Sequence, residues 1–181
     1  GYNSLVGMII GTDVRHESKE FLLKILDDVK GTNIEPPEEL GFQPGVCQWI
    51  CMYKDIDVAK KLLQTKDVKI NRFDRENRTG AFRLIESKDK KVVDMLRLLI
   101  EYGFDINLRY DDNCPTLLEG FLYAITKNYE AIELLIDHRA DINAFCSRQT
   151  NRKGEKITIY EFVMTKGDQK TKKIFNKFKV Q

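Results

Sequence analysis

Few side chains of this sequence have the type and spacing that acid–base or nucleophilic catalysis requires. It contains two histidines, His16 in a polar N-terminal stretch and His138 at the end of an expected helix. A lone histidine at a helix end usually bonds the exposed carbonyl groups there rather than acting as a general base. The sequence has no Gly-rich phosphate loop, nucleophile elbow or HExxH motif. It therefore predicts no enzyme activity within this chain.

The candidate metal ligands and cysteines also lack a recognised spacing. The adjacent acids Asp111 and Asp112, with Glu119 nearby, do not alternate around a central glycine as the ligands of a Ca²⁺ loop do. No two cysteines have the CxxC spacing of a zinc or redox site. Cys47 and Cys51 are four residues apart, so on a helix they would share one face and pack as small apolar groups. We therefore expect no metal, no cofactor and no disulfide.

The charge of the chain disfavours one class of partner and leaves another open. The 181 residues include 30 Lys and Arg against 28 Asp and Glu, and the net charge of +2 is too small for nucleic-acid binding through overall charge. Basic residues gather in 147–181, as either a solvated capping face or a surface for phosphate or acidic lipid. The longest N-terminal apolar run, Leu5 to Ile10, is far shorter than the ~20 residues that span a bilayer. We expect a protein of a reducing compartment, the cytoplasm or the nucleus, that does not enter a membrane.

One pattern recurs at a fixed interval and indicates which elements position these groups. The segments TKDVKIN (65–71), EYGFDIN (101–107) and DHRADIN (137–143) follow one another at intervals of 36 residues. Leucine pairs recur at the same interval, at 62–63, 98–99 and 134–135. An internal period of roughly 20–50 residues is the signature of stacked repeats. We therefore expect the middle of the chain to be a repeat array.

Each repeat contains an apolar pattern with the periodicity of a helix. The apolar residues of Val92–Leu99 fall on one stripe with the spacing i, i+3, i+4 and i+7, and the neighbouring repeats have similar stripes. No stretch between them alternates strictly over four or more residues, so the sequence predicts helix pairs joined by loops and an all-α fold. Gly103 can end one helix in a left-handed conformation. Arg139 and Asp67 occupy the same place in the other two repeats, where we expect looser helix ends. An Asn in each tail can bond the turn that follows it.

These features resemble the ankyrin repeat family. The tails GFDIN and RADIN are similar to that family's Gly-Ala-Asp-Val-Asn, and they occur together with the leucine pairs at a constant period. TGAF (79–82), PTLL (115–118) and ITIY (157–160) stand where the family has its Thr-Pro-Leu-His helix start, and Asp74–Asn77 is similar to the family's entry into a helix. The resemblance covers about residues 45–165 and implies a solenoid of stacked helix pairs. A tetratricopeptide array, with a repeat of roughly 34 residues, is the alternative. The Ile-Asn tails and polar loops favour the ankyrin interpretation.

The two ends of such an array have to cover its outermost apolar faces. We expect an N-terminal capping helix and its connection in residues 1–45, followed by three to four ankyrin-like repeats in 46–165. Residues 166–181 would form a basic C-terminal capping helix. Its Ile174, Phe175 and Phe178 would face the array while its lysines face water.

Binding is the function that remains after catalysis is disfavoured. The resemblance implies a concave face built from the loop tips and the first helix of each pair. Arginine and aromatic residues, which are enriched at interaction hot spots, gather at these tips. An aromatic residue follows each Ile-Asn tail, where it either binds a partner or packs between loops and stiffens the array. The candidate partner-binding residues are Arg72, Phe73, Arg75, Arg78, Arg109, Tyr110, Asp111, Asp112, Phe145 and Arg148.

We therefore expect a monomeric, non-catalytic protein-interaction module whose partner is another protein. The chain is rich in lysine, isoleucine and asparagine and poor in alanine, a usage common in AT-rich genomes. One version of the hypothesis is accordingly a host-directed effector or host-range factor acting in the host cytoplasm. Two alternatives stay open. They are an accessory domain that positions a catalytic domain outside this chain, and a phosphate- or lipid-binding surface on the basic C-terminal helix.

Overall fold

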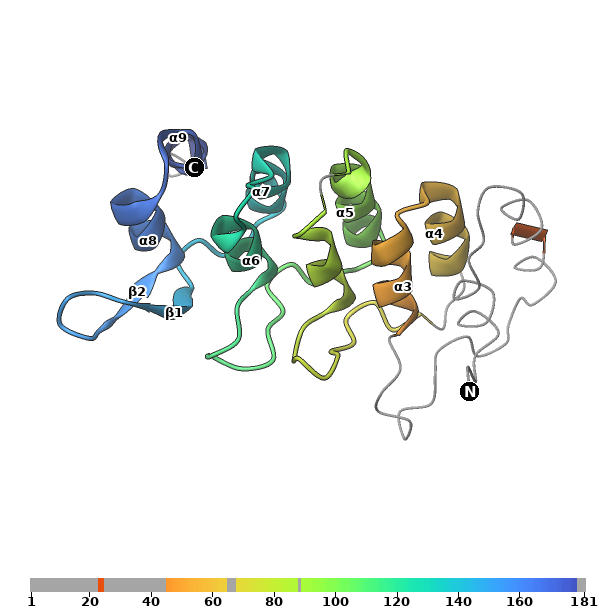
Figure 1. The fold of residues 1–181 in the computed structure, drawn as a ribbon, viewed down its shortest axis with the longest axis horizontal. Helices are drawn as coiled ribbons and strands as arrows, with labels where there is room; N and C mark the ends of the chain where they lie inside the picture. Colours follow the sequence, from red (N-terminus) through yellow and green to blue (C-terminus); the bar gives the residue numbers. More distant parts are fainter. Residues whose placement is uncertain (1–22, 25–44, 65–67, 88, 179–181) are drawn as a thin grey trace. The chain divides into compact units, whose positions relative to one another are not determined.

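The computed structural model describes residues 23–24, 45–64, 68–87 and 89–178. The chain divides into two compact units, Gly1–Phe104 and Asp105–Gln181, each with its own internal packing. Figure 1 draws the described helices and strands as a ribbon. The expected N-terminal capping helix lies outside the described residues, apart from Leu23 and Lys24. Within the described part, no helix is long and apolar enough to cross a bilayer.

The described part of the first unit contains two pairs of helices. Its described elements are α3 (Val46–Tyr53), α4 (Ile56–Leu63), the 3₁₀-helix η2 (Gly80–Leu84) and α5 (Lys91–Glu101). Within this unit α3 contacts η2 and α4 contacts α5, so the first helices of the two pairs lie together, and so do the second helices. Leu62 and Leu99 are almost completely buried, which confirms the apolar stripes predicted for α4 and α5.

The contact between α3 and η2 is close because position 80 is a glycine. A Cβ atom on Gly80 would lie 2.7 Å from the backbone nitrogen of Gln48 and 2.9 Å from Sγ of Cys47. These distances are shorter than van der Waals contact, so only glycine lets η2 approach the α3 backbone this closely. Cys47 and Cys51 are both buried, as their four-residue spacing on a helix predicts.

The second unit also contains two helix pairs and adds a hairpin before the second pair. Its elements are α6 (Leu117–Tyr123), α7 (Tyr129–Asp137), β1 (Phe145–Thr150), β2 (Lys156–Thr158), α8 (Ile159–Lys166) and α9 (Gln169–Phe178). Here α6 packs on α7, α8 packs on α9, and α7 contacts α9. The apolar residues Phe121, Leu135 and Phe175 are fully buried in its core. Ile174 is buried as well, so α9 turns an apolar face to the unit as predicted.

The expectation of an all-α fold is wrong for residues 145–158, which form an antiparallel hairpin. The two strands pair Phe145 with Thr158 and Thr150 with Lys156, and their register is irregular between these two pairs. An irregularity of this kind adds an unpaired residue to one strand and breaks the alternation of inward and outward side chains. The pattern that would mark a strand is therefore missing from the sequence. The described structure is helix-rich with one small two-stranded sheet.

Threonine begins helices in both units. Thr116 and Thr158 are the N-caps of α6 and α8, and each hydroxyl accepts the backbone N–H of the glutamate three residues later, Glu119 or Glu161. Each glutamate accepts the threonine N–H in return, so two N–H groups at the helix start are satisfied. Thr79 stands at the corresponding place before η2, where its buried hydroxyl has no hydrogen-bond partner in the part of the chain described. All three predicted segments therefore begin helical turns.

The helix end at Arg139 differs from the prediction. Gly103 follows α5 with a φ of 88°, and its N–H donates to the carbonyl oxygen of Ile100 at 3.0 Å. Arg139 follows α7 with a φ of 67°, and its N–H donates to the carbonyl oxygen of Ile136 at 2.9 Å. The two ends share one geometry, so the end at Arg139 is not looser, although a non-glycine residue in this conformation costs about 1 kcal/mol. Asp67 lies outside the described residues.

The Ile-Asn tails make one and the same contact in the two units. Nδ2 of Asn71 donates to the carbonyl oxygen of Gly103 in the first unit, and Nδ2 of Asn107 donates to that of Arg139 in the second, both at 3.1 Å. Oδ1 of Asn107 also accepts the N–H of Asp141 at 2.8 Å. Each asparagine therefore bonds a residue of the tail that follows 32 positions later, a partner that the sequence does not suggest. The bond joins residues the same distance apart in both units, in keeping with the constant repeat length.

Candidate interaction surface

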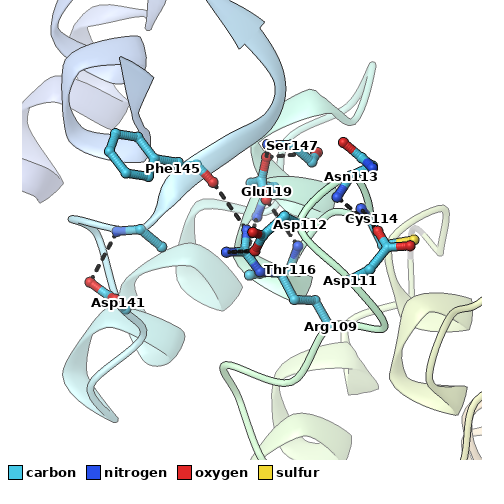
Figure 2. Close-up of polar contacts among 11 residues, drawn as sticks. Arg109, Asp111, Asp112, Asn113, Cys114, Thr116, Glu119, Asp141, Phe145 and Ser147 are labelled. Atoms are coloured by element: carbon cyan, nitrogen blue, oxygen red, sulfur yellow. Dashed lines mark hydrogen bonds and ion pairs between the residues drawn. The ribbon is translucent and has the colours of Figure 1, made fainter. Parts of the chain in front are cut away.

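One loop and the hairpin of the second unit are joined by Arg109 (Figure 2). Nη1 of Arg109 donates to the carbonyl oxygen of Phe145 at 3.2 Å, and Nη2 bonds Oδ1 of Asp112 at 2.9 Å. The planar guanidinium suits this position because its donors point in fixed directions. The Arg109 side chain is only 22% exposed. It therefore braces the loop 108–116 against the hairpin and is less available to a partner than the sequence suggests.

The same loop is shaped by Asp111. Its Oδ1 accepts the backbone N–H groups of Asn113 at 2.8 Å and Cys114 at 3.0 Å, as in an Asx turn. The pKa of Asp111 lies below its usual range, chiefly because of the hydrogen bond from the Asn113 N–H. The thiol and N–H of Cys114 and the charge of Arg109 lower the pKa further, while desolvation opposes them. Asp111 is therefore ionised at neutral pH. It is exposed, as is Asp112.

Glu119 holds the hairpin to α6 from the buried side. The residue is 1% exposed. Its Oε2 accepts the N–H of Thr116 at 3.0 Å, while its Oε1 accepts the N–H of Ser147 at 2.8 Å and the Ser147 hydroxyl at 3.0 Å. In the first unit Gln48 of α3 makes a similar bond, from Nε2 to Oδ2 of Asp74 at 2.9 Å. In each unit, a polar side chain of the first helix thus fixes the segment that follows the second helix.

A tyrosine and a cysteine beside Glu119 have their acid–base chemistry suppressed. Burial, followed by the neighbouring Cys146 and Glu119, raises the pKa of Tyr123 far above its usual range. Burial also raises the pKa of the Cys146 thiol to about 11, with the Glu119 charge adding to the effect and a hydrogen bond from Tyr123 opposing it. Both groups are protonated at neutral pH, and a thiol rather than a thiolate is a poor nucleophile. This cluster therefore contributes packing and hydrogen bonds rather than a reactive group.

The far end of the hairpin is a compact polar turn. The N–H of Asn151 donates to the carbonyl oxygen of Glu155 at 2.9 Å, and Gly154 adopts a φ of 82° that only glycine takes without strain. The basic side chains around this turn are all exposed. We call them the tip cations, and they are Arg148, Arg152, Lys153 and Lys156.

The predicted binding residues of the second unit include its two exposed aromatic rings. Tyr110 is 56% exposed in the loop and Phe145 is 54% exposed at the start of β1. Figure 2 shows the Phe145 ring pointing away from Arg109 and Glu119 while its carbonyl group points toward them. Arg148 is exposed on the same strand as Phe145. The structure thus brings the loop and hairpin candidates together and leaves both rings accessible to solvent.

The predicted binding residues of the first unit lie in the loop that follows α4. Arg75 is exposed, whereas Arg72 and Phe73 are half-buried. Nη1 of Arg78 bonds Oε2 of Glu76 at 3.0 Å, so this arginine is engaged within its own loop. These four candidates therefore lie in one loop, but their side chains differ in solvent exposure.

The segment 74–77 does not enter a helix, so the expectation taken from the family resemblance is wrong here. Oδ1 of Asp74 accepts the N–H groups of Glu76 at 2.8 Å and Arg78 at 3.0 Å, which closes a turn. Asn77 adopts a left-handed φ of 57° within this turn. The helical residues begin only at Gly80.

The sequence alone does not identify the residues that hold the hairpin or form its tip. Glu119 and Ser147 are 28 residues apart, and no sequence pattern pairs them. Arg152 and Lys153 stand in what reads as a longer polar loop. The turn segment 151–154, flanked by residues that favour strands, is the signal that could have revealed the hairpin.

Most of the other candidate reactive residues have structural roles. Nδ1 of His138 lies 2.9 Å from the carbonyl oxygen of Leu134 at the end of α7, as predicted for a helix-end histidine. His16 lies outside the described residues. The cysteines are free thiols, and burial, with the neighbouring Cys47, raises the pKa of Cys51. Within the described ranges, His, Cys, Asp and Glu side chains do not gather in any group of three that could hold a metal ion.

Compared with protein-family models and with curated proteins, the chain matches neither. Its function is therefore inferred from its own residues. The geometry to be explained is a loop, 108–116, and a hairpin, 145–158, that are braced by Arg109 and Glu119 and expose aromatic and basic side chains.

Proposed function

We propose that this protein is a non-catalytic protein-interaction module whose partner binds the loop 108–116 and the hairpin of the second unit. The observation that carries the proposal is the exposure of Tyr110, Phe145 and Arg148 on two segments that are bonded to each other. Tyrosine and arginine are enriched at hot spots. Tyrosine buries a large area while losing little conformational entropy, and the planar guanidinium of arginine fixes the direction of its hydrogen bonds. A surface whose backbone is already fixed also loses little entropy on binding. The internal braces therefore favour recognition.

The repeats support a proposal about architecture. Equivalent helices lie together within the first unit, and Asn71 and Asn107 make the same contact in their respective units. We infer an ankyrin-like solenoid in which the leucine pairs at 62–63, 98–99 and 134–135 take equivalent core positions. In such a solenoid the loop tips and first helices line a concave face. The fold does not name the partner, so the binding residues have to be tested directly.

The proposal is tested by photo-cross-linking from the full chain in cell lysate. Benzoylphenylalanine is placed at position 110, 145 or 125, and Ile125 is the matched control because it is apolar, fully exposed and in the same unit but outside the loop and hairpin. We expect one partner protein to be cross-linked from positions 110 and 145 but not from 125. The purified partner should bind the chain reversibly, and Tyr110→Ala should weaken binding about tenfold without changing the Tm.

Two results would overturn the proposal. One is the absence of any protein cross-linked from both 110 and 145. The other is equal cross-linking of the same protein from 125, which would indicate non-specific contact. A Tyr110→Ala variant whose Tm falls by several degrees, with binding reduced only in proportion, would show that this ring stabilises the array instead of contacting a partner.

A further inference from the structure

The hairpin carries positive charge that the rest of the described chain leaves unneutralised. Residues 145–158 include the four tip cations and one acidic residue, Glu155. In the part of the chain that the structure describes, none of the tip cations forms an ion pair. Oε2 of Glu155 is itself engaged, because it accepts a hydrogen bond from Nδ2 of Asn151 at 2.7 Å. The cations are therefore available to an external anion.

The second basic region, α9, has more of its charged side chains engaged within the protein. Nζ of Lys177 bonds Oε1 of Glu133, and Nζ of Lys170 lies 4.2 Å from the ring centroid of Tyr129. Both contacts fix lysines of α9 on α7, which accounts for two of the four lysines that α9 contains. The hairpin is therefore the stronger candidate for an anion-binding surface.

The charge at the tip continues into an apolar and then an acidic region. The exposed Phe145 ring begins β1, and its carbonyl oxygen is bonded to Arg109, which also holds the exposed Asp112. Asp111, in the same loop, is negative at neutral pH because its pKa is lowered. A ligand lying along the hairpin would therefore meet cations at the tip, a ring at the base and carboxylates beyond it.

We propose that the hairpin binds an acidic segment of a partner protein, with two or more carboxylates paired to the tip cations and one apolar side chain placed on the Phe145 ring. This inference rests on the proposed function and specifies the chemistry of the partner. An arginine fork bonds a carboxylate through two parallel N–H groups, which fixes direction as well as charge. The hairpin is held in place by Arg109 and Glu119, so binding needs little reorganisation.

A protein segment fits this surface better than a nucleic acid does. The unit 105–181 has nearly as many acidic as basic residues, so it lacks the excess of positive charge that phosphate backbones require. Asp111 and Asp112 would repel a continuous line of phosphates passing the base of the hairpin. A peptide can place its carboxylates at the tip and an uncharged, apolar side chain at Phe145, and so avoids that repulsion.

The experiment uses the full chain and a fluorescent synthetic peptide in which glutamates flank one central leucine. Binding is followed by anisotropy in dilute buffer. Reversing two tip cations, Arg152→Glu with Lys153→Glu, should weaken binding at least about tenfold. The matched control, Lys172→Glu with Lys173→Glu on α9, changes the net charge equally and should weaken binding less than about twofold. Phe145→Ala should weaken binding of the leucine peptide several-fold but leave binding of a serine-substituted peptide unchanged.

Controls separate the possible ligands. Single-stranded DNA and vesicles containing phosphatidylserine are titrated in the same way, and circular dichroism checks that each variant folds. The inference fails if the peptide does not bind, if the two charge reversals weaken binding equally, or if DNA or vesicles bind more tightly than the peptide through the same cations.

The same variants also separate this inference from the proposed function. If the Arg152→Glu, Lys153→Glu variant still captures the partner from positions 110 and 145 as the wild-type chain does, the hairpin tip is not the contact. The proposed function would then stand without this inference. If no partner is captured by any variant or by the wild-type chain, the proposed function itself fails.

Discussion

The substitution Glu119→Gln should lower the free energy of unfolding of the second unit by about 2–4 kcal/mol. The buried Glu119 side chain accepts two backbone N–H groups, those of Thr116 and Ser147, and the Ser147 hydroxyl. A glutamine keeps one acceptor oxygen and replaces the other with an NH₂ donor, so at least one buried N–H would face another donor. One unsatisfied buried donor costs about 1–3 kcal/mol, and the bonds that remain are weaker by roughly 1 kcal/mol because they no longer involve a carboxylate.

The second capping glutamate provides a matched control. Glu161 of α8 makes the same reciprocal bonds with Thr158, but it is exposed. Water can satisfy the groups that Glu161→Gln leaves unpaired, so we expect a loss of about 0.5 kcal/mol or less. The measurement is urea-induced unfolding of the full chain followed by circular dichroism. Amide hydrogen exchange at Ser147 reports separately whether the hairpin has detached from α6.

The reasoning would be refuted by equal losses for Glu119→Gln and Glu161→Gln. It would also be refuted by a loss for Glu119→Gln below roughly 0.5 kcal/mol with unchanged exchange at Ser147, because a buried donor cannot lose its acceptor at so little cost. Either result would mean that the Glu119 carboxylate does not hold the hairpin.

Three further perturbations follow from particular backbone and side-chain contacts. Gly80→Ala places a Cβ atom 2.7 Å from the α3 backbone and should cost about 1–3 kcal/mol in urea unfolding, so a neutral result would contradict the close packing of η2. At the two left-handed helix ends, the two substitutions should have opposite effects. Gly103→Ala should cost about 1 kcal/mol through backbone strain alone, because the added Cβ meets no atom within 4 Å, whereas Arg139→Gly should stabilise the protein by about 0.5–1 kcal/mol. Thermal melts in which the two changes in Tm have the same sign would contradict this. Desolvation raises the pKa of Asp168, but hydrogen bonds outweigh it and hold this pKa well below its usual range. These bonds come from Lys127 and from the N–H and hydroxyl groups of Thr171. The stability contributed by Asp168 is therefore present above its unfolded pKa of about 3.9 and is lost as the pH falls below that value, so the Tm difference between wild type and Asp168→Asn should be largest near neutral pH and shrink in acid.

Local periodicity in the sequence is enough to predict most helices. The stripes of Val92–Leu99 and its counterparts define α4, α5 and α7, because a buried helix face repeats its apolar residues about every 3.6 positions. Thr116 and Thr158 mark helix starts for an equally local reason, since a cap bonds a residue only three positions away. Features of this kind can be read from sequence because both partners fall within one short window.

The parts that the sequence does not predict depend on distant partners. Arg109 stands at a loop tip and reads as a binding residue, but its guanidinium is directed to a carbonyl group 36 residues later. Arg139 reads as a poor helix end, but its carbonyl oxygen is bonded by Asn107 from the preceding tail, which helps to fix the left-handed turn. The hairpin escapes detection because its irregular register removes the alternation that marks a strand. For Arg109 and Arg139 the deciding contact lies outside any local window.

The residues that hold neighbouring segments together lie close to each other in the sequence, which affects how this protein folds. Several of the side-chain bonds that hold its segments together join residues 26 to 44 positions apart, from Gln48 and Asp74 to Glu133 and Lys177. The entropy cost of closing a loop grows only with the logarithm of its length, so loops of this length cost little more to close than shorter ones. Within each unit, the second helix pair can therefore dock on the first as soon as it has been synthesised. During translation, the first pair of a unit would expose the apolar face that its partner covers only until that second pair is made.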